Sequence, residues 1–325
     1  MKAEILAALR ETDSYVSGQE LCKKFGVSRT AVWKAINQLK KEGYEIEAVN
    51  NRGYHIVSAP DVLSENELVS INKTEWIGKK IYYQDVTDST NTQANHLAET
   101  GATHGTLVVA DRQEVGRGRR GRGWESPAHT GIFMTLLLKP ELAPGNASML
   151  TLVTALAVTK GIERVTGLSP RIKWPNDIVI RGKKVCGILT EMSAQIDYVN
   201  HIIIGVGINV QNESFPEEIA QVATSLKLET GSTVNRAKLI EAIWEEFEKY
   251  YEQFMQTQNL KEMVQEYNTY LVNRNQKVRV LDPKGPFEGL AQGITERGEL
   301  VVDTWEARRL VTSGEVSVRG IYGYV

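Results

Sequence analysis

Residues 116–124 read GRGRRGRGW, and their flanking sequence decides whether they form the cofactor loop of a dinucleotide-binding fold or a different kind of loop. They match the pattern G-x-G-x-x-G, which in a dinucleotide-binding fold directly follows a strand and opens a helix. Here residues 111–115 separate the glycines from the apolar strand predicted at 107–110, and Gly123 and Pro127 disfavour a helix after them. The flanking sequence therefore argues against a Rossmann cofactor loop.

The residue types in segment 116–124 favour a loop that binds an anionic ligand. Glycines let the backbone approach a ligand closely, and arginine stays charged with a fork that matches phosphate or carboxylate oxygens. Trp124 adds a flat face for a ring. A nucleotide would use all three features. A solvated basic surface loop and a nucleic-acid-binding patch are the alternatives that this segment alone leaves open.

Length and composition set the frame for the rest of the chain. With 325 residues it exceeds what one hydrophobic core usually supports, so two or three domains are expected. The net charge of -2 means that any binding of a polyanion must come from local patches. Cys22 and Cys186 lie far apart, which indicates neither a disulfide framework nor a zinc site. Neither a signal peptide nor a membrane-spanning apolar run is apparent, so we expect a cytoplasmic protein with no membrane partner.

The first sixty residues have the pattern of a helix-turn-helix. A capping box at 17–20 opens a short helix, and Ser28 caps a second helix that runs to about Lys40. In the second helix Val32 and Leu39 belong to an apolar stripe that faces the core. We expect Trp33, at the margin of this stripe, to pack against the domain and not to read bases.

A predicted hairpin at 44–57 completes a winged helix over residues 1–60. Residues 19–43 contain six Lys or Arg against two acids, which supports contact with DNA phosphates. Winged helices also serve as protein-interaction modules, so a role in binding another protein stays open as the alternative. Specific binding by so small a module requires a dimer on two half-sites. The expected DNA contacts are Ser28, Arg29, Thr30, Lys34, Asn37 and Arg52.

Residues beyond the linker at 59–64 mix helices and strands. A polar helix is predicted after Ser89 and Thr90, strands at 106–110 and 131–138, and a long helix at about 147–165. This mixture predicts an α+β sheet with helices on one face. From the sequence alone, Ser89 and Thr90 are best explained as helix-capping residues.

Two further clusters carry polar chemistry beside predicted strands. Asp177 of KWPND, at 173–177, can orient a magnesium-bound phosphate or a ligand amine, although a turn residue is the simpler explanation. Of Lys183 and Lys184, only one can face a shared site, because side chains alternate along a strand. The glycines in GVGINV, at 205–210, clear one strand face for a helix or a ligand.

The C-terminal part begins with an amphipathic helix predicted at 235–256. From Lys277 onward, short β runs alternate with turns. This alternation predicts a small SH3-like barrel.

Four segments, in this order, resemble motifs of the biotin-protein ligase family: GRGRRGRGW, KWPND, KVCGIL at 184–189 and GVGINV. With the winged helix, the chain resembles the bifunctional members that also act as biotin operon repressors. The resemblance implies domains at 1–60, 61–272 and 273–325, the central one with a class II synthetase-like mixed sheet. Gly123 departs from the family's pattern, in which a larger residue often precedes the tryptophan.

The resemblance also implies a reaction, its cofactors and its partners. Biotin is activated by ATP with Mg²⁺ to biotinyl-5'-AMP, and biotin then passes to one lysine of a biotin carboxyl carrier protein. The adenylate-bound protein forms a homodimer that binds operator DNA. Two alternatives stay open: a lipoate or octanoate ligase, and a ligand-sensing repressor without catalysis.

Roles of single residues follow from the same resemblance. Catalysis falls to Lys184, Arg119 and Arg117. The biotin site comprises Ser89, Thr90, Gln113, Gly116, Arg117, Arg119, Lys184, Gly187, Gly205 and Ile208. The ATP site comprises Arg119, Arg120, Arg122, Trp124, Asn176, Lys184, Asn209 and Arg319. Asp177 is the expected Mg²⁺ ligand.

Overall fold

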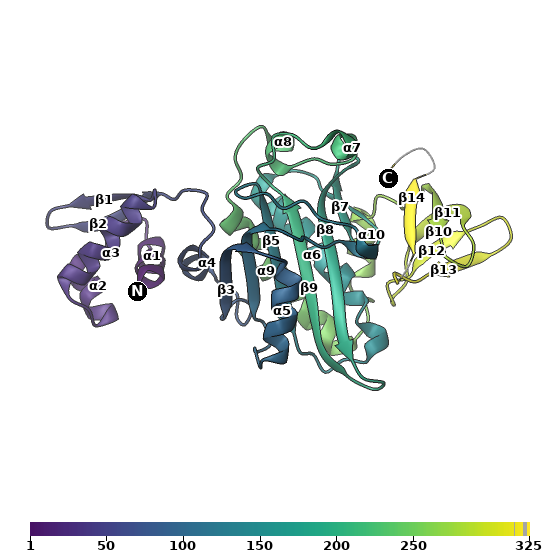
Figure 1. The fold of residues 1–325 in the computed structure, drawn as a ribbon, viewed down its shortest axis with the longest axis horizontal. Coiled ribbons are helices and arrows are strands. Elements are labelled where there is room, and N and C mark those ends of the chain that lie inside the picture. Colours follow the sequence, from purple (N-terminus) through teal and green to yellow (C-terminus); the bar gives the residue numbers. More distant parts are fainter. Residues whose placement is uncertain (315, 321–323) are drawn as a thin grey trace.

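The computed structural model describes residues 1–314, 316–320 and 324–325. Three β-sheets follow one another along the chain, and Figure 1 shows them arranged as a small N-terminal unit, a large central unit and a small C-terminal unit. No helix in the described residues is long and apolar enough to cross a membrane. The α+β multidomain architecture predicted from the sequence is confirmed.

The N-terminal unit is a winged helix, as predicted. Its elements are α1 (Lys2–Arg10), α2 (Gly18–Phe25), α3 (Arg29–Lys41), β1 (Glu45–Val49) and β2 (Gly53–Ser58). Ser17 and Glu20 form the predicted capping box, and the Ser28 side chain accepts a hydrogen bond from the Ala31 backbone N–H. The expectation that Trp33 packs was wrong: 58% of its surface is exposed.

The central sheet has seven strands in the order β3-β4-β5-β9-β8-β7-β6. Only β3 and β4 pair in parallel, so the sheet is mixed. The strands are β3 (Ile81–Thr87), β4 (Leu107–Gln113), β5 (Gly131–Leu138), β6 (Arg171–Lys173), β7 (Asp177–Ile180), β8 (Lys183–Ala194) and β9 (Val199–Asn209).

Helices cover both faces of this sheet, which corrects the one-sided arrangement expected from the sequence (Figure 1). The helices α6 (Met149–Thr166) and α9 (Arg236–Thr257) pack with the main core. On the other face, Ala94 and Ala98 of α5 (Thr90–Glu99) pack against alternate strand residues. All eight residues of β5 are therefore buried.

Shorter helices fill the connections: α4 (Glu65–Ile71), α7 (Glu217–Ala220), α8 (Leu226–Thr230) and α10 (Val264–Tyr270). The C-terminal unit is antiparallel, in the order β13-β12-β11-β10-β14. Its strands are β10 (Lys277–Leu281), β11 (Phe287–Ile294), β12 (Leu300–Asp303), β13 (Arg308–Val311) and β14 (Ser317–Gly320). The predicted small β domain is confirmed, but within the described residues its edge strands β13 and β14 do not pair to close a barrel.

Candidate active site

The glycine-arginine segment folds back on itself as a narrow hairpin. The Trp124 N–H donates to the Gly116 carbonyl at 2.9 Å, and the Gly118 N–H donates to the Arg122 carbonyl at 2.7 Å. Only a single turn of 3-10 helix, at 119–121, interrupts it, and Arg120 there has a φ of 59°. No Rossmann-type helix follows β4, in agreement with the sequence analysis. We call residues 114–130, which connect β4 to β5, the ligand loop.

Trp124 lies against glycines of two neighbouring strands. A Cβ placed on Gly207 of β9 would lie 2.8 Å from the indole, and one on Gly187 of β8 would lie 3.0 Å from it. Among the residues that the structure describes, the buried indole Nε1 has no hydrogen-bond partner. Larger residues on these strands would therefore displace the ring, and the glycines form the floor on which the loop closes.

At one end of the cavity, polar side chains hold one another in place. The backbone N–H and hydroxyl of Thr90 donate to Gln113 Oε1 at 2.9 and 3.1 Å, and Gln113 Nε2 donates to the Ser126 hydroxyl at 2.9 Å. Ser89 is the N-cap of α5, but its side chain makes no capping hydrogen bond. The side-chain capping expected for Ser89 was therefore wrong, and this residue lines the cavity.

Asn91, which the sequence analysis missed, organises the same end. It donates to Glu191 at 2.7 Å and accepts from Thr135 at 2.7 Å. A Cβ on Gly205 would lie 2.1 Å from Asn91 Oδ1, so this glycine makes room for a side chain of α5. The role of Gly205 therefore depends on α5, which is distant from β9 in sequence.

The other end of the cavity is cationic. Lys184 Nζ lies 2.6 Å from Asp177 Oδ1 and 5.2 Å from the centre of the Trp124 ring. Lys183 is exposed, which confirms that only one of the two lysines faces the site. Burial raises the pKa of Asp177, but the Lys184 and Lys173 ammonium groups outweigh it and lower the pKa overall. Burial lowers the pKa of Lys173 to about 8.

The C-terminal unit reaches into this cationic end. Arg119 donates to Asn176 Oδ1 at 2.9 Å and to the carbonyls of Ser313 and Gly314 at 2.8 and 2.6 Å. Tyr324 donates to Asp177 Oδ2 at 2.5 Å, and its ring centre lies 3.9 Å from Lys173 Nζ. Nothing in the sequence marks Tyr324, because its contacts depend on how the C-terminal unit docks.

One cavity joins both ends, and it brings together most of the predicted residues. Predicted residues that line it are Ser89, Thr90, Gln113, Arg117, Arg119, Trp124, Asn176, Lys184, Gly187 and Gly205. Lining residues that were not assigned a role beforehand are Asn91, Gly118, Phe133, Met134, Ile188, Leu189, Val206 and Gly207.

The other predicted residues lie outside this lining. Ile208 is fully buried in the main core on the opposite face of β9, because side chains alternate along the strand. Gly116 packs against the Trp124 carbonyl, 2.2 Å from where its Cβ would be, so it closes the hairpin and does not widen the cavity. Asn209 donates to the Thr224 carbonyl at 3.1 Å. Arg120, Arg122 and Arg319 are exposed.

The winged helix presents the expected polar surface on α3. Arg29, Thr30 and Lys34 are exposed, whereas the apolar stripe of the helix is buried. At the tip of the wing, the Arg52 guanidinium lies 4.5 Å from the centre of the Tyr15 ring. Trp33 adds an exposed aromatic face to the same helix.

Comparison with known protein families matches each of the three units. The Biotin/lipoate A/B protein ligase family model matches residues 83–209, an HTH domain model matches 2–55, and the Biotin protein ligase C terminal domain model matches 275–319. The bifunctional ligase/repressor BirA of Bacillus spizizenii is 43% identical over 306 residues, which cover 94% of each chain. The chain belongs to the family of bifunctional biotin-protein ligases and repressors.

Two further proteins are similar to this chain, one in sequence and one in fold as well. The BirA protein of Bacillus subtilis is 42% identical and likewise covers 94% of each chain. The biotin protein ligase of Aquifex aeolicus, in complex with biotin and ATP, is 31% identical and superposes with a TM-score of 0.66. That structure covers 74% of this chain and 99% of its own. The family is therefore confirmed over nearly the whole length of this chain.

Proposed function

We propose that this chain activates biotin with ATP and transfers it to a lysine of a biotin carboxyl carrier protein. In the first step a biotin carboxylate oxygen attacks the α-phosphorus of ATP, the bond to the β-phosphate oxygen breaks, and pyrophosphate leaves. In the second step the neutral amine of the carrier lysine attacks the acyl carbon, the amine gives up a proton, and AMP leaves. The products are a biotinyl-lysine amide and AMP.

The single observation that carries this proposal is the cavity with one end lined mainly by uncharged polar side chains and one cationic end. The uncharged polar groups around Thr90 and Gln113 suit the ring system of biotin. Lys184 and Arg119, at the other end, suit the carboxylate and the phosphates, whose mutual repulsion they would offset. Trp124 between them offers its ring to adenine.

Mg²⁺ fits this proposal as part of the nucleotide substrate. Magnesium is commonly held by substrate phosphates with few protein carboxylates. Both oxygens of Asp177 are engaged, one by Lys184 and the other by Tyr324. We therefore assign Asp177 first to orienting Lys184, and its binding of Mg²⁺ stays a prediction. Roles for Asn209 and Arg319 at the nucleotide likewise stay predictions.

We further propose that the winged helix represses transcription when the site holds biotinyl-5'-AMP. In a homodimer, the outer face of α3, with the exposed Ser28 at its start and the half-buried Asn37 further along it, would contact operator DNA. Domain boundaries at 60/61 and 272/273, a carrier protein as acceptor and a cytoplasmic location belong to the same proposal.

Biotin-dependent exchange of pyrophosphate into ATP tests the ligase function. We expect exchange with biotin and none with lipoate or octanoate, and a loss of at least a hundredfold in Lys184→Met, because one preorganised charge at the transferring group is worth about that much. Exchange with lipoate alone, or none at all, would reject the proposal.

An operator shift assay tests repression. With biotin and ATP present, we expect a dimer-sized complex with operator DNA, and weaker binding when either substrate is left out. Arg119→Ala should weaken both adenylate retention and operator binding. Operator affinity that does not respond to the substrates would contradict the coupling.

A further inference from the structure

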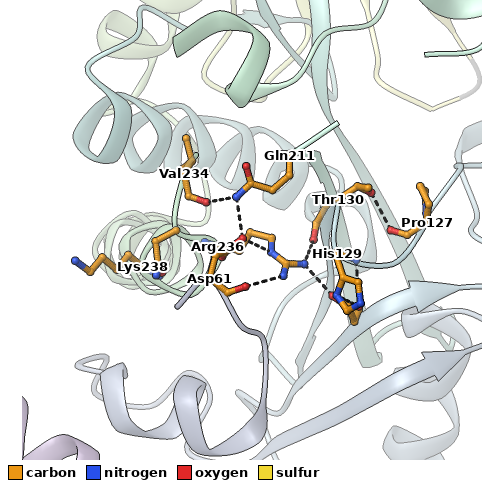
Figure 2. Close-up of polar contacts among 11 residues, drawn as sticks. Asp61, Pro127, His129, Thr130, Gln211, Val234, Arg236 and Lys238 are labelled. Carbon is orange, nitrogen blue, oxygen red and sulfur yellow. Dashed lines mark hydrogen bonds and ion pairs between the residues drawn. The ribbon is translucent and has the colours of Figure 1, made fainter. Parts of the chain in front are cut away.

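A buried polar cluster lies outside the cavity, where the linker after the winged helix meets the base of the ligand loop (Figure 2). At its centre is Arg236, the first residue of α9, whose side chain is 2% exposed. Its partners come from three separate parts of the chain. We call Asp61, Asp111, His129, Gln211 and Arg236 the Arg236 cluster.

On one side, Arg236 holds the linker. Its backbone N–H donates to Asp61 Oδ1 at 2.8 Å, its Nε to Oδ2 at 3.0 Å and its Nη2 to the Asp61 carbonyl at 3.2 Å. Gln211 Nε2 also donates to Asp61 Oδ2, at 2.8 Å. Asp61 lies between β2 of the winged helix and α4 of the central unit. The linker is therefore fixed by several hydrogen bonds at one residue.

On the other side, the same guanidinium holds both ends of the ligand loop. Its Nη1 donates to Asp111 Oδ1 on β4 at 2.8 Å and to the Gly131 carbonyl at the start of β5 at 3.3 Å. Asp111 Oδ2 accepts from the His129 backbone N–H at 3.1 Å and lies 2.9 Å from His129 Nδ1. Asp111 is two residues before Gln113, which binds Thr90 inside the cavity. Figure 2 shows Arg236 between Asp61 and the segment around His129.

Because the Arg236 guanidinium is buried, its contacts to the linker and its contacts to the ligand loop constrain each other. Its charge is tolerated in the interior only while carboxylates and carbonyls satisfy it. Because the fork is planar and rigid, moving it to follow one carboxylate misplaces its donors toward the other. A shift of the loop ends is therefore opposed by the linker contacts, and a shift of the linker by the loop contacts.

We propose that Arg236 is a positioning residue that couples the ligand loop to the linker of the DNA-binding domain. This inference rests on the proposed function, since it uses adenylate binding and operator binding as the two linked events. A coupling free energy is reciprocal. Weakening the linker contact must then loosen the hold of the loop on the adenylate, although Asp61 does not line the cavity.

Asp61→Asn tests this coupling in the full chain. The amide keeps one acceptor oxygen in place of two and removes the charge. We expect biotinyl-5'-AMP to dissociate at least fivefold faster, and operator binding at saturating adenylate to weaken by a similar factor. Asp111→Asn should act in the same direction from the loop side. If Asp61→Asn does not fold, Asp61→Glu, which keeps the charge at a displaced position, is judged by the same criterion.

Glu245→Gln is the matched control. Glu245, on α9, is likewise a carboxylate paired with an arginine, at 2.6 Å from Arg164, but this arginine lies on α6 and belongs neither to the linker nor to the ligand loop. We expect its adenylate dissociation rate to equal that of the wild type. The inference would be overturned if biotinyl-5'-AMP dissociated from Asp61→Asn at the wild-type rate, or if Asp61→Asn and Glu245→Gln changed this rate equally. Absence of biotin-dependent exchange in the wild-type chain would instead overturn the proposed function.

Discussion

At the scale of single residues, glycines determine what lies against the central sheet. Gly187 and Gly207 accept the Trp124 ring, and Gly205 accepts Asn91. The sequence pattern predicts cleared space on one strand face, but it does not predict what fills that space. The side chains that fill this space come from α5 and from the ligand loop, which are distant from β8 and β9 in sequence. These glycines therefore contribute to the site by leaving room for the side chains of Trp124 and Asn91.

Gly207→Val tests this role. The new side chain would start 2.8 Å from the Trp124 indole, so the ring must leave its place on β9. We expect the KM for ATP to rise about tenfold or more, with a smaller change in the KM for biotin, measured by pyrophosphate exchange. Gly145→Ala is the matched control, because its Cβ meets nothing within 4 Å. An unchanged KM for ATP would mean that Trp124 does not contribute to nucleotide binding.

Residue-level prediction succeeded where strand periodicity decides and failed where packing between distant segments decides. Alternation correctly separated Lys184 from Lys183. The same alternation places Ile208 in the core, which the assignment by resemblance overlooked. Tyr324 could not be predicted, because only the docking of the C-terminal unit brings it to Asp177.

At the scale of elements, α3 carries the exposed basic residues that we propose contact DNA. Its buried stripe was predictable from helical spacing, whereas the exposure of Trp33 was not, since a residue at the margin of a stripe can face either way. The exposed basic residues of α3 are available for DNA phosphates.

Lys34→Ala tests the contribution of this helix. If Lys34 contacts a phosphate, its loss should weaken operator binding at all sequences and reduce the slope of log K against log salt by about one. Ligase activity should not change. Lys249→Ala, which removes an exposed lysine of α9, should leave both the affinity and the slope at wild-type values. An unaltered slope in Lys34→Ala would place the DNA on another face.

The turn between α5 and β4 carries a half-buried histidine, His104. The ring of His104 packs 4.6 Å from that of Trp76 and its Nδ1 accepts from the Lys139 backbone N–H. Burial lowers the pKa of His104 below its usual value. Its protonated form is therefore disfavoured in the folded state.

Stability should thus decline as the pH falls below about 6.5, where an unfolded histidine begins to bind its proton while the folded one does not. His104→Asn keeps an acceptor near Nδ1 but cannot titrate. The free energy of unfolding is measured by urea titration at several pH values between about pH 5 and pH 8. We expect it to fall less steeply toward acid pH in His104→Asn than in the wild type. Parallel pH profiles would show that His104 is protonated equally in both states.

At the scale of the whole molecule, the winged helix is docked on the central unit and does not hang from a free linker. Arg10 of α1 pairs with Glu67 of α4 through two hydrogen bonds, at 2.7 and 2.8 Å. Tyr44 donates to the same carboxylate at 2.6 Å. Together with the Arg236 cluster, this contact gives the DNA-binding unit two fixed points on the ligase. The three units were predictable from composition and motifs, but the contacts between them were not, because no local pattern encodes which surfaces meet.

Arg10→Ala tests the docking. It leaves the Glu67 carboxylate, whose side chain is 1% exposed, without its cation, and breaking such a buried pair costs about 3–5 kcal/mol. We expect the winged helix to unfold in a separate transition at lower denaturant, while the central unit keeps its midpoint. Lys24→Ala removes the partner of Glu11 from an exposed pair, so it should cost less than about 1 kcal/mol. If Arg10→Ala unfolds in one transition with the wild-type midpoint, the Tyr44 hydrogen bond to Glu67 and the Arg236 cluster are sufficient to hold the DNA-binding unit on the ligase.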